Sequence, residues 1–192
     1  LADNPDYNRE AAVQVAHAIT THKVEVEDDF YTAVDDLKKP SEDAGAGFIG
    51  ELGFGSGVFY LYACIDRDQL TRNLGGDAAL AKKAIEAFAE GFATVSPSGK
   101  QNSFAAHARA SYLRVEKGSR QPRSLAAAFF KPVGGDDLLN SSLKCLDGKD
   151  GLIGQMNAVY GACFDASYEM RCIPGAPVSG SLAEAIAFAA GE

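Results

Sequence analysis

Two histidines and the acids that follow them are the residues best suited to chemistry in this sequence. The acids that come after His17 and His22 are Glu25, Glu27, Asp28, Asp29, Asp35 and Asp36. Imidazole and carboxylate groups together can bind a divalent metal or transfer protons. Metal-binding histidines on a helix stand four residues apart, but these two are five apart, about 140° around a helix. We therefore favour a structural or interface role for them, with a small metal-dependent hydrolase as the alternative.

The sequence carries none of the common catalytic motifs. It has no GxSxG, no P-loop and no GxGxxG between a predicted strand and a predicted helix. Its four cysteines form no CxxC pair, which is typical of free thiols in a reducing compartment. They are Cys64, Cys145, Cys163 and Cys172. We expect no enzymatic activity, no bound metal and no cofactor.

The composition is that of an ordinary globular domain. The chain has 192 residues, of which 46% are hydrophobic and 23% are charged, enough to build one core. No apolar run approaches the ~18–20 residues that span a bilayer. We expect a cytoplasmic protein without a membrane partner.

Charge is distributed unevenly along the chain, whose net charge is −8. Residues 25–51 hold nine acids and two lysines, whereas residues 100–131 hold seven bases and one acid, Glu116. Such asymmetry favours a polyanion-binding face on a protein that also meets basic partners. Chance clustering on a solvated surface remains the alternative.

Hydrophobic periodicity predicts an α+β chain. An Ala-rich stretch after Pro5 predicts a helix over about residues 5–20. Alternation in residues 23–27 and 48–62, around a polar, Gly-rich tip at residues 38–47, predicts a long β-hairpin-like excursion. The further elements predicted are helices over 66–75, 77–94 and 136–160 (interrupted near 147–148), strands over 104–115, 124–133 and 163–172, and a helix opened by Ser181. This mixed order favours a ferredoxin-like sheet.

One loop of the basic segment suits contact with nucleic acid. Residues 98–104 combine small residues, Lys100 and several side-chain hydrogen-bond donors. Backbone amides in such a loop can follow a phosphate chain without reading bases. Phe104 and Tyr112 are available for stacking, although core packing is the commoner role of such residues. An ordinary helix-to-strand connection remains the alternative.

Three long segments in order resemble one protein family. AHAITTHKVEVEDDFYTAVDDL (16–37), GFGSGVFYLYACIDRDQLTRNLGG (53–76) and PSGKQNSFAAHARA (97–110) are similar to the CasC family, the repeated backbone subunit of type I-E CRISPR Cascade. The resemblance runs from about Ala11 to Tyr112 and continues more loosely to the C-terminus.

The resemblance implies a non-enzymatic protein that binds CRISPR RNA, the guide of an antiviral surveillance complex. Family members have a palm with a modified RRM (ferredoxin-like) fold, helical fingers and a thumb. Copies stack into a helical filament along the guide, and each thumb displaces one nucleotide at regular intervals. The guide bases between thumbs pair with target DNA. The implied partners are CRISPR RNA, target DNA, copies of the chain itself and other Cascade subunits.

The family pattern implies one partial domain: a palm helix at 1–21, the thumb at 22–57, and palm and C-terminal elements at 58–192. The implied RNA-binding residues are Phe30, Tyr31 and Val34 in the thumb, Lys100 and Gln101 near the RNA backbone, and the weaker candidate Ser56. The family often has Trp at position 30, where an aromatic ring remains. Family members are longer, and an Arg-Met pair precedes the position where this sequence starts. We therefore expect a C-terminal portion whose palm lacks strands.

Overall fold

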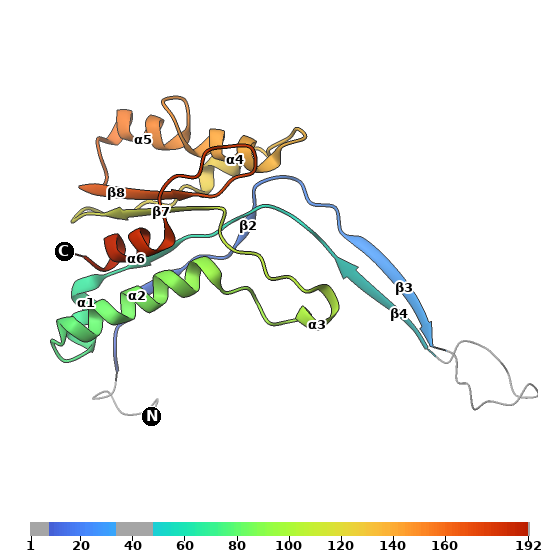
Figure 1. Ribbon diagram of the computed structural model, residues 1–192, viewed down its shortest axis with the longest axis horizontal. Coiled ribbons are helices and arrows are strands. Elements are labelled where there is room, and N and C mark those ends of the chain that lie inside the picture. The colour runs from blue at the N-terminus through green and yellow to red at the C-terminus, as the bar shows by residue number, and fades with distance from the viewer. Residues whose placement is uncertain (1–7, 34–47, 192) are drawn as a thin grey trace, which may run out of the picture.

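A two-stranded antiparallel ribbon forms a long arm that projects from the rest of the molecule (Figure 1). The computed structural model describes residues 8–33 and 48–191. In the arm, β3 (Glu27–Ala33) pairs with β4 (Phe48–Phe54), with Glu27 opposite Phe54 at one end and Ala33 opposite Phe48 at the other. The prediction of two extended segments that pair is confirmed, but the first strand lies at β3 and shares only Glu27 with the predicted 23–27. The predicted tip, 38–47, lies outside the described residues.

The segment that leads into the arm is extended, not helical. β1 (Val13–Val15) pairs with β6 (Ala63–Ile65), and β2 (Ile19–Thr20) pairs with β5 (Phe59–Tyr60). The helix predicted over 5–20, and with it a palm helix at 1–21, is therefore wrong for the described residues. Pairing with a segment about 45 residues away overrides the moderate helix propensity of the alanines.

The three strand pairs follow one another along the same two segments of chain, but their registers are not continuous. The connection between β1 and β2 has three residues, but the opposite connection, between β5 and β6, has two. Likewise, the connection between β2 and β3 has six residues, but the opposite connection, between β4 and β5, has four. An extra residue on one strand bends a ribbon and increases its twist. His17 and His22 lie in these two longer connections.

Two predicted helices begin where their capping aspartates indicate. α1 (Arg67–Asn73) and α2 (Ala78–Thr94) have Asp66 and Asp77 as N-caps, and each carboxylate accepts a hydrogen bond from a backbone N–H three residues later. Each such cap contributes about 1 kcal/mol. None of the helices in the described residues is long and apolar enough to cross a bilayer.

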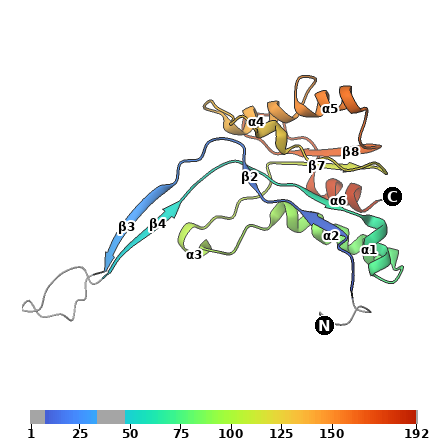
Figure 2. The same ribbon diagram turned by 180° about the vertical axis from the view of Figure 1, so that it is seen from behind.

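Helices flank both sides of a second ribbon. β7 (Tyr112–Lys117) pairs antiparallel with β8 (Ala166–Arg171). The helices α4 (Leu138–Leu146) and α5 (Leu152–Tyr160) and the 3-10 turn η2 (Ala126–Phe129) lie on one side of this ribbon. On the other side lie α2 and α6 (Leu182–Ala190) (Figures 1 and 2). A further short helix, α3, spans Gln101–Phe104. The α+β class is confirmed, and within the described residues every strand pairs with one partner strand.

The later predictions have mixed outcomes. The interruption near 147–148, the strand within 163–172 and the Ser181 cap are confirmed by α4, α5, β8 and α6. The strand predicted over 104–115 begins only at Tyr112, and 124–133 contains the 3-10 turn η2 instead of a strand. The 3-10 turn places the Phe129 side chain in the core, where it is buried.

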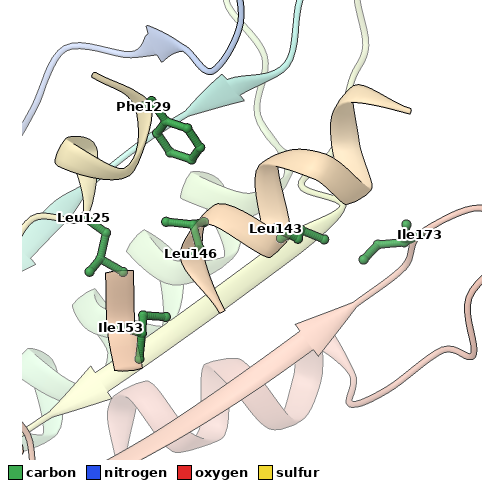
Figure 3. Close-up of a cluster of buried hydrophobic side chains, with 6 residues drawn as sticks. All are labelled: Leu125, Phe129, Leu143, Leu146, Ile153 and Ile173. Carbon is green, nitrogen blue, oxygen red and sulfur yellow. The ribbon is translucent and has the colours of Figure 1, made fainter. Parts of the chain in front are cut away.

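The main core lies between η2, α4, α5 and the chain after β8 (Figure 3). Its buried members are Leu125, Phe129, Leu143, Leu146, Ile153 and Ile173. Burying each such side chain stabilises the fold by about 1.5–3 kcal/mol. The N-terminal ribbon is joined to this core, because the Tyr60 ring contacts the Phe129 ring at a tilt of 50° and the Tyr60 hydroxyl accepts a hydrogen bond from the Leu125 N–H at 2.8 Å. The root of the arm is therefore held by the core.

Candidate RNA-binding surface

The two aromatic residues predicted to act together lie on opposite faces of the arm. Successive side chains on a strand point to opposite faces, so Phe30 shares one face with Glu51 and Tyr31 shares the other with Gly50. Phe30 is 68% exposed and Tyr31 is 50% exposed. Val34, the third predicted thumb residue, lies outside the described residues. Phe30 and Tyr31 therefore cannot contact one nucleotide from the same side.

The Tyr31 ring lies across the backbone of Gly50. A methyl group on Gly50 would collide with the ring carbons and the hydroxyl of Tyr31. A glycine opposite an aromatic residue lets the ring cover the neighbouring strand, which stabilises the pair of strands. Tyr31 therefore strengthens the ribbon, whereas Phe30 presents its ring to solvent.

His22 stabilises the root of the arm. Its Nε2 accepts a hydrogen bond from the Val58 N–H at 3.1 Å, and its Nδ1 donates to the Lys23 carbonyl at 2.8 Å, which assigns the proton to Nδ1. The Nε2 bond thus joins the two segments of the ribbon, the Nδ1 bond fixes the ring against its own segment, and His17 is exposed. No group of three His, Cys, Asp or Glu side chains suited to a metal occurs in residues 8–33 and 48–191.

The loop that carries Lys100 and Gln101 lies against the root of the arm. The Phe104 ring, at the end of α3, contacts the Phe54 ring of β4 with centroids 5.8 Å apart. The Gln101 side-chain amide donates to the Pro97 carbonyl at 2.8 Å, so it braces the loop internally. Lys100 is exposed at the start of α3. The structure therefore brings Lys100 and Gln101 close to the arm.

Ser56 lies between β4 and β5, where the ribbon bends toward the arm. Its side chain is exposed. The longer connection that contains His22 runs opposite this segment, because the His22 ring binds the Val58 N–H. Ser56 is thus near the arm root on the chain segment that leads out of β4.

Part of the basic segment is buried in ion pairs. Arg114 and Arg123 both donate to Glu116, at 2.7 and 2.9 Å, and Arg114 also pairs with Glu169 of β8. The Arg123 side chain is only 4% exposed. Both guanidinium groups also lie about 5 Å from the Phe164 ring, at 5.1 and 5.0 Å from its centroid. The prediction that the whole segment forms a polyanion-binding face is therefore wrong for these two arginines.

The network fixes the protonation of its members. Burial favours the neutral form of Glu116, but the hydrogen bonds from Arg123 and Arg114 outweigh it and lower the pKa of this carboxyl. Burial likewise disfavours the charged form of Arg114, yet its hydrogen bond to Glu116 raises its pKa. The bases of the segment that remain exposed are Lys100, Arg109, Arg120 and Lys131. Any contact of this segment with a polyanion therefore falls to those exposed bases.

Sequence reasoning missed one residue of this surface. Phe54 lies at the end of the alternating pattern of β4, and nothing local indicates that it meets Phe104, which is 50 residues further along the chain. The opposite orientations of Phe30 and Tyr31 could have been predicted, because neighbouring residues on a strand point to opposite faces. Phe54 and Phe104 add an aromatic pair to the predicted set.

Comparisons with known proteins identify relatives. The profile of a family described as CT1975-like protein matches residues 1–171. A chain of a "CRISPR RNA-guided surveillance complex, pre-nicking" is 30% identical with a TM-score of 0.80, over 99% of this chain and 52% of that one. A chain of a "CRISPR RNA-guided surveillance complex" is 34% identical with a TM-score of 0.73, over 88% and 62%. No curated protein matches. The chain thus spans between half and two thirds of the length of these two chains.

Proposed function

Because the chain belongs to the CT1975-like family of CRISPR-associated proteins, in agreement with the resemblance in its sequence, we propose that it is a CRISPR RNA-binding backbone subunit of a type I-E Cascade complex. The observation that carries the proposal is the projecting arm, with exposed Phe30 on one face and the Lys100 loop at its root. Proteins bind a single RNA strand by stacking aromatic rings on its bases and by placing cations near its phosphates.

The arm is the thumb in this proposal, within residues 22–57, and the remaining elements are part of a modified RRM palm. Phe30 wedges beside one displaced nucleotide of the guide, and Val34 assists it. Lys100 and Gln101 contact the RNA backbone, with Ser56 near the arm root. The 68% exposure of Phe30 on the face of β3 opposite Tyr31 supports its role as the wedge.

Copies of the chain stack along the guide in this proposal. An open apolar groove of about 450 Å³ lies between α2 and the N-terminal ribbon, and Val15, Leu61 and Phe88 are among the residues that line it. Exposed apolar surface marks interfaces, and a heterologous contact that does not close yields a filament.

The subunit itself performs no chemistry in this proposal. Guide bases between successive thumbs remain free to pair with target DNA, and other Cascade subunits complete the complex. Destruction of the target in antiviral defence belongs to a separate nuclease. The expected location of such a complex is the cytoplasm.

Replacing Lys100 with Ala should weaken binding of single-stranded RNA about 3- to 10-fold, because one phosphate contact is lost. The loss should be similar for all sequences, and the slope of log K against log salt should fall by about 0.7. Fluorescence anisotropy with a labelled, unstructured RNA across a salt series measures both quantities. Lys149→Ala, which removes an exposed lysine after α4, serves as the control. Equal slopes for Lys100→Ala and wild type would remove Lys100 from the interface.

A further inference from the structure

An aromatic pair at the root of the arm remains half open to solvent. The Phe54 and Phe104 rings contact each other at 5.8 Å with planes inclined by 35°. Phe54 is nevertheless 39% exposed and Phe104 is 44% exposed. The main core forms around η2, α4 and α5, and neither ring belongs to it. The contact therefore positions two rings without burying them.

The two edges of the arm differ in chemistry on the face that carries Phe54. Cross-strand partners share a face, so Tyr31, Leu52 and Phe54 lie together on it. The β3 edge of the same face carries Glu27 opposite Phe54 and Asp29 opposite Leu52. The α3 loop lies on the β4 side of the arm (Figures 1 and 2). The apolar and aromatic strip is thus continuous with the loop, and the acids lie along the outer edge.

A cation stands one turn from the aromatic pair. The Phe104 N–H donates to the Lys100 carbonyl at 3.0 Å and closes a single helical turn. Both ends of this turn are left-handed, at Lys100 (φ 61°) and Ala105 (φ 50°), and these are the only such non-glycine residues in the described chain. Side chains disfavour this conformation, so it persists where the surrounding structure imposes it. The Gln101 bond to Pro97 and the Phe54 contact are such constraints.

We infer that Phe54 and Phe104 form a stacking subsite for one base of single-stranded RNA, whose adjoining phosphate lies beside Lys100. This inference rests on the proposed function and adds a second aromatic contact, on the arm face opposite Phe30. A ring pair with an adjacent cation matches the base and phosphate of one nucleotide. Glu27 and Asp29 repel phosphate, so on this face of the arm the RNA strand follows β4 and the α3 loop and avoids the β3 edge.

The test compares two replacements of Phe104 in the whole chain. Phe104→Leu keeps an apolar side chain but removes the aromatic face, whereas Phe104→Tyr keeps it. We expect the Leu variant to bind a labelled, unstructured RNA about 5-fold or more weakly, and the Tyr variant to stay within about 2-fold of wild type. Phe130→Leu removes an 87% exposed ring after η2 and should leave affinity unchanged. Phe54→Leu should repeat the loss.

A second readout separates stacking from a merely structural role. RNA that contains 4-thiouridine should crosslink to peptides with Phe54 or Phe104 under long-wave light, and mass spectrometry identifies these peptides. Wild-type binding with an unchanged Phe104→Leu affinity would overturn the subsite alone. A Leu variant with normal RNA affinity but altered self-association would assign the rings to a protein contact instead. Absence of RNA binding by wild type at low salt would overturn the proposed function and the subsite together.

Discussion

Replacing Glu116 with Gln should lower the free energy of unfolding by about 3 kcal/mol, because the buried Arg123 guanidinium loses its carboxylate partner and Arg114 loses one of its two, keeping Glu169. Arg114 and Arg123 both donate to this side chain, and neither can lose its proton to escape the buried charge. A domain is stable by about 5–15 kcal/mol, so the loss is a large fraction of the total. Urea unfolding followed by circular dichroism measures it.

Asp150→Asn is the matched control, since it removes one negative charge from an exposed side chain. Its effect should stay within about 0.5 kcal/mol. If Glu116→Gln unfolded at the same urea concentration as Asp150→Asn, the buried network would not stabilise the β7–β8 ribbon.

Acid should act on the same network. Asp147 belongs to this network because it pairs with Arg171, which also pairs with Glu169. The pKa values of Glu116 and Asp147 are lowered in the folded chain from their ordinary values of 4.5 and 3.8. The unfolded chain therefore takes up protons first, so this stabilisation is complete above about pH 5 and is lost as pH falls through the folded values. Glu116→Gln should lose less stability than wild type over that same interval. If the free energies of unfolding of wild type and Glu116→Gln fell equally as pH is lowered, Glu116 would not contribute to the acid sensitivity.

Replacing Phe30 with Ala should weaken binding of single-stranded RNA by about 5- to 150-fold, because one base–ring stack contributes about 1–3 kcal/mol. Phe30 is 68% exposed, so its removal should change the unfolding midpoint little. Phe30→Trp keeps an aromatic ring on the same face of β3 and should retain wild-type affinity. Fluorescence anisotropy with a labelled RNA measures all three proteins.

Phe130→Ala removes another highly exposed ring, after η2, and should leave RNA affinity unchanged. An equal loss for Phe30→Ala and Phe130→Ala would mean that any exposed ring serves, and the arm would have no special role. Full affinity of Phe30→Ala would remove the wedge from the proposal.

Elements with local signals could be predicted from the sequence. Asp66 and Asp77 cap α1 and α2 through contacts within three residues. A polar, Gly-rich stretch between two segments predicted to be extended indicates the arm, although not the bounds of β3. The N-terminal strands could not be predicted, because their partners, β5 and β6, lie about 40 to 50 residues away. Short Ala- and Val-rich segments satisfy a helix or a strand equally well until that pairing is known.

The residues of the candidate surface also divide into those that the sequence indicates and those whose contacts depend on the fold. Exposed aromatic residues on an acidic arm were visible in the sequence, and so was Lys100. The sequence indicates the ion pair of Arg114 with Glu116, which follows it by two residues on the same strand face. The ion pair of Arg114 with Glu169 could not be predicted, because it depends on the register of β7 and β8. The Phe54–Phe104 contact depends wholly on the path of the chain from α2 back to the arm.

The most direct test of the proposal is chemical probing of the guide RNA in the complex assembled with this chain, nucleotide by nucleotide. If each arm displaces one nucleotide, the bound RNA should show strongly reactive positions at one constant spacing, with protected backbone between them. Phe30→Ala should weaken those reactive positions while it leaves their spacing unchanged. Uniform reactivity along the guide, or protection without a period, would contradict the proposal that the arm is a thumb.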